Sequence, residues 1–227
     1  MKKQPGMLLI MLMIVIGASA QKTKKSEQFA DLSVGFGSSS QGSISAGYFY
    51  NWKFGKRNKL FIGTGARFNV YYGKKINFLS APANLAAEES KTDTLLGANP
   101  GIYSMNALIN LGYNFSSKLQ AGFNIDVVGF SFGPEGSPTF IGNGSTINTK
   151  AKPTGFNLLL VGNNDRGSIN SEFYIRYKIN SHIGVKAAYE YFFTELTTTS
   201  KVQTVPEKND RFRNKASLFN IGISYHF

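Results

Sequence analysis

Few side chains in this sequence are of the kinds that carry out covalent chemistry. The chain has two histidines, His182 and His226, and no cysteine, which excludes disulfides and thiolate nucleophiles. A hydrolase or acyltransferase of membrane lipids would need a histidine paired with a serine near the lipid headgroups. Ser171 and Ser224 both belong to the alternating pattern described below, which accounts for them without a catalytic role. We therefore expect no catalytic residue.

Two carboxylates, Glu172 and Glu190, could form an acid/base couple. Ion pairing with the nearby Arg176 or Lys186 is the simpler explanation, because buried charges need partners. The sequence has no histidine and cysteine cluster for a transition metal, and "NNDRGS" has too few acidic residues for a calcium loop. The prediction is a protein that is not an enzyme and has no metal site and no cofactor.

The elements that position these residues are strands, because apolar side chains recur at every second position over most of the chain. The last stretch, "SLFNIGISYHF", places five apolar residues on one face, and no convincing helical period follows residue 20. The alternation predicts eight strands, at residues 30–36, 44–54, 60–70, 105–115, 119–127, 169–177, 183–193 and 219–227.

The connections between these strands alternate between tight turns and longer segments. The expected tight turns are 55–58, 116–118 and 180–182. The connections at the other end are one short segment at 38–42 and three large loops at about 73–101, 133–167 and 196–215. In an up-and-down barrel this places all the tight turns and both termini at one end, as in outer-membrane barrels.

Charge is confined to one face of the expected strands. The faces opposite the apolar ones carry Asp31, Lys53, Arg67, Asp126, Glu172, Arg176, Lys178, Lys186 and Glu190. A soluble barrel would place apolar residues inside, whereas a transmembrane barrel turns them toward lipid. We predict an all-β, eight-stranded antiparallel up-and-down transmembrane β-barrel with a polar, largely filled interior. Its interior charge network would comprise Arg67, Asp126, Glu172, Arg176, Lys186 and Glu190.

The amino terminus has the pattern of a secretory signal peptide. Two lysines precede an apolar run that is too short to span a membrane, and Ala18-Ser19-Ala20 is a typical cleavage site. The expected organisation is a cleaved signal peptide at 1–20, a short periplasmic segment at 21–28 and the barrel at 29–227. An exported chain seldom meets nucleic acid, so its formal charge of +12 suggests anionic lipid headgroups or sugar phosphates as partners. Lys208, Arg211, Arg213 and Lys215 are the candidate headgroup contacts, and a solvated loop face is the alternative.

The last eight residues resemble a known signal. Asn220, Gly222, Tyr225 and Phe227 match the polar, glycine, aromatic, aromatic pattern by which the barrel-assembly machinery recognises outer-membrane proteins. The chain after residue 20 resembles the small eight-stranded barrels of the OmpA and OmpX type. The stretches "KPTGFNLLLVGNNDRGSINSEFYIRY" and "NDRFRNKASLFNIGISY" resemble uncharacterised outer-membrane β-barrel-domain proteins common in Bacteroidetes. The resemblance implies the bacterial outer membrane as the location and implies no activity.

Specific function is therefore expected in the loops. The main hypothesis is a non-enzymatic, monomeric barrel with a structural or surface-interaction role, in contact with outer-membrane lipid and lipopolysaccharide and with an extracellular protein or ligand at its three large loops. The alternatives are a small pore or transport component and, third, a lipid-modifying enzyme. The apolar run at 156–161 is either a strand extension turned back by residues 162–167 or a loop folded over the barrel mouth or binding a partner.

Overall fold

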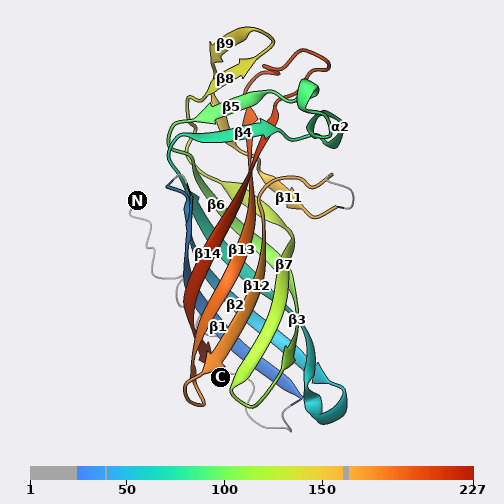
Figure 1. Cartoon of the computed structure of the whole chain (residues 1–227), viewed down its shortest axis with the longest axis vertical. Helices are drawn as coiled ribbons and strands as arrows, with labels where there is room; N and C mark the ends of the chain where they lie inside the picture. Colours follow the sequence, from blue (N-terminus) through green and yellow to red (C-terminus); the bar gives the residue numbers. More distant parts are fainter. Residues whose placement is uncertain (1–24, 39, 161–163) are drawn as a thin grey trace, which may run out of the picture.

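A computed structural model describes residues 25–38, 40–160 and 164–227, so the predicted signal peptide lies outside the described residues. Eight long strands form the body of the molecule (Figure 1). They are β1 (Ser26–Gly37), β2 (Gly42–Phe54), β3 (Leu60–Tyr72), β6 (Gly101–Asn114), β7 (Leu119–Phe132), β12 (Ile169–Lys178), β13 (Ile183–Thr198) and β14 (Arg211–His226).

These eight strands close into a barrel. Each pairs antiparallel with the preceding and the following long strand. The last strand, β14, also pairs with β1, so the sheet has no open edge along its body. The predicted eight-stranded antiparallel up-and-down barrel is thereby confirmed.

The wall of the barrel is apolar outside and polar inside. On β14, Phe219 and Ile223 are 59% and 58% exposed, whereas Asn220 between them is fully buried. The same alternation holds on the other long strands and produces a continuous exposed apolar band. Such a band is far larger than soluble proteins expose, and it is the outer surface of a transmembrane barrel.

Several strands extend beyond their predicted ends. The first strand begins at Ser26 rather than at residue 29 or 30, because Glu27 and Phe29 continue its inward face. The strands β13 and β14 are each 16 residues long, and their pairing continues to Thr197 and Arg211. The last connection is therefore 199–210, shorter than the predicted loop.

The predicted loops at 73–101 and 133–167 contain further strands. β4 (Ile76–Ser80), β5 (Thr94–Gly97), β8 (Thr139–Gly142) and β9 (Ser145–Asn148) continue the sheet from β14 in the order β14–β4–β5–β8–β9. A short strand, β10 (Ala151–Pro153), pairs with the upper part of β13. We call residues 73–100, 134–155 and 199–210 the extension. It projects beyond the barrel at the end opposite the tight turns (Figure 1).

The apolar run at 156–161 is the start of a hairpin in the barrel wall. β11 (Phe156–Leu158) pairs with the upper part of β7, and Leu158 forms a bridge with Arg166 on the returning chain. The described part agrees with the predicted strand extension; Val161 lies outside the described residues.

The strand β7 contains a bulge beside Ala107 and Leu108 of β6, at which Val127 has no partner in the register. Beyond it the outward residues are Val128, Phe130 and Phe132.

The described helices are short: η1 (Lys56–Asn58), α2 (Ala83–Ala86) and η2 (Glu89–Lys91). The expected short helix after Pro82 is α2. None of the helices in the described ranges has the length and apolar character needed to span a membrane.

Apolar side chains also fill parts of the interior. The largest cluster joins inward residues of the barrel, such as Tyr71 and Phe192, to Phe78, Leu95 and Phe140 of the extension. Two smaller clusters, Phe29–Phe49–Leu108 and Phe61–Tyr174–Ala188, lie among the inward residues of the barrel strands. The extension is therefore packed onto the end of the barrel as part of one core.

Candidate functional site

The lumen holds a connected network of buried charges. Arg67 on β3 lies at one side of it, with its Nη2 2.6 Å from Asp126 Oδ1 and its Nη1 3.4 Å from Glu172 Oε2. The guanidinium also donates to Asn124 Oδ1 and to the carbonyl oxygen of Asn170. One arginine thus binds groups from β7 and β12 across the lumen.

Three further charges extend this network. Lys186 Nζ lies 2.7 Å from Glu172 Oε1 and 3.1 Å from Asp31 Oδ2. Arg176 donates to the same Asp31 oxygen at 2.8 Å, and its guanidinium lies 3.8 Å from the Phe29 ring centroid. A continuous chain of ion pairs therefore joins β7, β3, β12, β13 and β1.

Glu190 is buried beside this network, and its described contacts are hydrogen bonds from neutral groups. It accepts hydrogen bonds from Ser43 at 2.8 Å, Asn170 at 2.6 Å and Asn220 at 2.8 Å. In the register, Glu172 faces Glu190 and Arg176 faces Lys186, so like charges lie opposite each other on β12 and β13. Glu172 instead pairs with Arg67 of β3 and, diagonally, with Lys186 of β13, while Arg176 pairs with Asp31 of β1.

All six charges predicted to line the interior lie in the lumen, and five of them belong to the network of ion pairs. Asp31 was not among those six, although it lies on the polar face of the predicted first strand. Its role could not be read from the sequence because the contacts run across the barrel.

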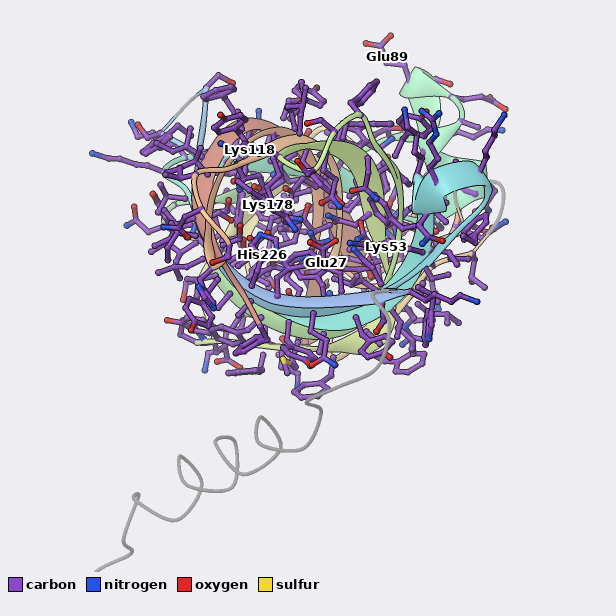
Figure 2. The ribbon with its side chains drawn as sticks, turned by 90° about the horizontal axis from the view of Figure 1, so that it is seen from below. Glu27, Lys53, Glu89, Lys118, Lys178 and His226 are labelled. Carbon is purple, nitrogen blue, oxygen red and sulfur yellow. The ribbon has the colours of Figure 1, made fainter. Side chains whose placement is uncertain are left out.

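A second cluster of ionisable side chains lies in the lumen at the tight-turn end. Glu27 of β1 binds Lys53 at 3.0 Å, and it also accepts a hydrogen bond from Lys178. His226 Nδ1 lies 3.1 Å from the same carboxylate. Figure 2 shows Glu27, Lys53, Lys178 and His226 together inside the ring of strands. This cluster was not predicted, because Glu27 precedes the predicted barrel.

Ser224, His226 and Glu27 are aligned like a hydrolase triad. Ser224 Oγ lies 3.2 Å from His226 Nε2, and His226 Nδ1 faces Glu27. However, Ser224 is 2% exposed and His226 is 3% exposed, so a substrate has no access to the hydroxyl in this conformation. Glu27 is also shared with two lysines. The arrangement is better explained as a buried hydrogen-bonded cluster than as an activated serine nucleophile.

The predicted headgroup contacts do not form one surface. Arg211 and Arg213 both bind Glu195, at 2.8 Å each, and Arg213 is 6% exposed. Lys208 and Lys215 are exposed. Glu195 and Arg213 lie on the outward face of β13 and β14, the face of Phe193 and Ser217. They are buried there because the chain at Asp165 contacts them, and its carbonyl oxygen accepts hydrogen bonds from Arg211 and Arg213. Contact of the four basic residues with anionic headgroups stays a prediction.

The residues of the expected assembly signal lie on both faces of β14. Tyr225 and Phe227 face outward and are 47% and 53% exposed, whereas Asn220 binds Glu190 inside. At Gly222 a Cβ atom would lie 2.6 Å from the Cβ of Ser33 on β1, so this glycine permits close approach at the closing seam. Recognition by the assembly machinery stays a prediction.

Comparisons with known proteins return matches of overall structure. No family model matches the chain, and no curated protein sequence matches it. A de novo designed transmembrane β-barrel is 11% identical, with a TM-score of 0.39, and the match covers 91% of this chain and 100% of that one.

Two natural surface proteins are similar to the same extent. Neisserial surface protein A is 11% identical with a TM-score of 0.38, and the match covers 89% of this chain and 96% of that one. The attachment invasion locus protein Ail of Yersinia pestis is 9% identical with a TM-score of 0.38, covering 90% of this chain and all of that one. From its own strand pairing and its two faces, the chain has the fold of a small eight-stranded outer-membrane β-barrel.

Proposed function

We propose that the protein is a non-enzymatic barrel of the bacterial outer membrane, and that its role is structural or a surface interaction through the extension. The main observation in support of this function is that the lumen is filled, while the connections at one end are folded into a sheet. Charged side chains occupy the middle of the lumen, and the apolar cluster around Tyr71, Phe192 and Phe212 occupies its extension end. A filled lumen favours a surface role over a conduit.

The membrane location follows from the exposed apolar band and the asymmetry of the connections. With the tight turns in the periplasm, as in outer-membrane barrels, the extension would face the exterior. The barrel would then be a monomer whose wall is surrounded by lipid and lipopolysaccharide.

The extension offers a candidate binding surface. A cavity of about 610 Å³ lies where β4 and α2 meet the upper part of β14. Ala83, Ala86 and the 47% exposed Leu79 give it apolar walls, while Glu89 and Lys215 give it charges of both signs. Ligand pockets commonly measure roughly 300–1,000 Å³ and combine apolar walls with a few polar groups. An extracellular protein segment or small ligand is the proposed partner.

Conductance of the refolded full chain in a planar lipid bilayer tests this proposal. We expect no steady current above that of the lipid alone, because the charge network and the apolar cluster block the lumen. A double variant with smaller side chains in that cluster, Phe192→Ala and Phe212→Ala, serves as the comparison for a partly opened lumen. Steady current through the unmodified protein would contradict the proposal and support the conduit alternative.

A further inference from the structure

The tight-turn end carries an excess of positive charge that neither the barrel nor the proposed function explains. The basic residues at this end are Lys25, Lys53, Lys56, Arg57, Lys59, Lys118 and Lys178. In the part of the chain that the structure describes, Glu27 is the one acidic side chain among them. The lumen charges, in contrast, nearly balance.

Some of these cations converge on a cavity. A space of about 330 Å³ lies between the β2–β3 turn and the β6–β7 turn, with Lys53, Arg57, Lys59 and Lys178 in its walls. Asn58, Asn114, Ser116 and Ser117 add polar groups to the same walls. Cationic donors surrounded by neutral donors are suited to an anion with several oxygen atoms.

The charge in this cavity is only partly neutralised. Lys53 and Lys178 share Glu27, so two cations have one counterion. Lys59 Nζ lies 5.5 Å from the ring centroid of Tyr113, and Arg57 is exposed. Four cations against one carboxylate leave the cavity strongly positive.

The cavity also borders the lipid-facing wall. Phe115, which lines it, is 55% exposed, and Leu60, which follows Lys59, is 44% exposed. A ligand with an anionic head and an apolar chain could place its head among the cations and its chain along these side chains. The position of the cavity beside the lipid-facing wall suits a lipid headgroup, and its positive charge suits a soluble anion as well.

We propose that this cavity binds a phosphate group, carried either by a phospholipid of the adjacent leaflet or by a soluble phosphate ester. Arg57 and Lys59 supply the charge that Glu27 does not offset, and Lys53 and Lys178 are held in place by that carboxylate. The site is independent of the proposed role of the extension, which lies at the other end of the barrel (Figure 1).

Calorimetric titration of the full chain in a non-ionic detergent tests the site and distinguishes the two sources. The probes are short-chain phosphatidylglycerol, short-chain phosphatidylcholine, glycerol 3-phosphate and inorganic phosphate. Binding of phosphatidylglycerol in preference to the two soluble probes would identify the lipid headgroup. Comparable binding of glycerol 3-phosphate would identify a soluble ester.

Two charge-matched variants decide whether the cavity is the binding site. Arg57→Asn with Lys59→Gln removes two charges from the cavity, and asparagine tolerates the positive φ of 61° at position 57. Lys56→Gln with Lys118→Gln removes two charges from the same end but from outside the cavity walls. We expect affinity for the bound probe to fall at least tenfold in the first variant and less than twofold in the second.

Circular dichroism and thermal unfolding of both variants verify that the barrel is intact. Equal loss of affinity in the two variants would show that binding depends on general surface charge and would overturn the proposal. Failure of all four probes to bind the unmodified protein would overturn it as well. Neither result bears on the conductance experiment, so the two proposals fail separately.

Discussion

Buried charges in the lumen are stabilised only where each carboxylate keeps its donors. Asp126 receives two hydrogen bonds from Arg67, one from Asn106 at 2.8 Å and one from the Asn170 backbone at 3.0 Å. Asp31 instead has two cationic partners, Arg176 and Lys186. The two carboxylates therefore differ in their dependence on any single arginine.

Replacing Arg67 with methionine should destabilise the barrel more than replacing Arg176 in the same way. Arg67→Met leaves Asp126 with neutral donors, which costs about 3–5 kcal/mol in a dry site. Arg176→Met leaves Lys186 beside Asp31, so its effect should be smaller. Urea unfolding in lipid or detergent, followed by tryptophan fluorescence from Trp52, measures both.

The double variant Arg67→Met with Asp126→Leu is the matched control. Because it removes both charges of the pair, it should recover much of the stability that the single variant loses. Equal stability of the two arginine variants, or no recovery in the double variant, would show that the network is hydrated and that its ion pairs contribute little.

At the scale of the strands, glycines make room for the inward aromatic rings. Gly112 of β6 faces Gly122 of β7 in the register. A Cβ atom at Gly112 would lie 2.2 Å from the Phe61 ring, and one at Gly122 would lie 2.6 Å from the Tyr174 hydroxyl. The two aromatic rings fill this part of the lumen because the two glycines leave it empty.

The variant Gly112→Ala should therefore lower stability by about 1–3 kcal/mol, the usual cost of overpacking a filled interior. Gly101→Ala is the control on the same strand, because no atom lies within 4 Å of its added methyl group. Urea unfolding should separate the two variants. Similar midpoints would mean that the Phe61 ring and the β7 backbone, whose Ala121 carbonyl oxygen would lie 2.4 Å from the added Cβ atom, both shift at little cost.

The last strand carries the prediction about assembly. Replacing Tyr225 and Phe227 with serine should reduce the amount of protein in the outer membrane and leave it in the periplasm, because the aromatic positions of the expected signal are lost. The control variant, Ile221→Ser with Ile223→Ser, removes lipid-facing area on the same strand and spares these positions. Fractionation of cells followed by immunoblotting measures both, and equal defects would argue against a specific signal.

How far the sequence predicts each element depends on its length. The long strands could be predicted because many consecutive residues alternate between lipid and the lumen. The extension could not, because β5, β8 and β9 are four residues each, too short to establish a period. The lumen charges were predicted individually, but Asp31 was missed as a partner because its pairs with Arg176 and Lys186 cross the barrel and leave no spacing in the sequence. Glu27 was missed because it precedes the predicted start of the first strand.

At the scale of the whole molecule, the two ends differ in architecture and should differ in accessibility. An epitope inserted at the β8–β9 turn, between Asn143 and Gly144, should be labelled by antibody on intact cells. An epitope at Lys56 should be labelled only after the outer membrane is permeabilised. Thr198 falls in the predicted loop at 196–215, but it is a poor insertion point because it is buried at the end of β13. The reverse labelling pattern would invert the orientation.

The position of β14 sets the order in which the molecule is completed. This strand is the last of the chain, yet β4 joins the barrel through it, with Ser80 and Leu79 facing Phe212 and Arg213. The four strands that continue the sheet from β14, namely β4, β5, β8 and β9, are therefore synthesised before the strand on which they rest. Until β14 arrives, β4 has an unpaired edge, which is a risk for aggregation. Closure of the barrel and completion of the extension are consequently one event in time, and an antibody specific for the finished extension would report that the barrel has closed.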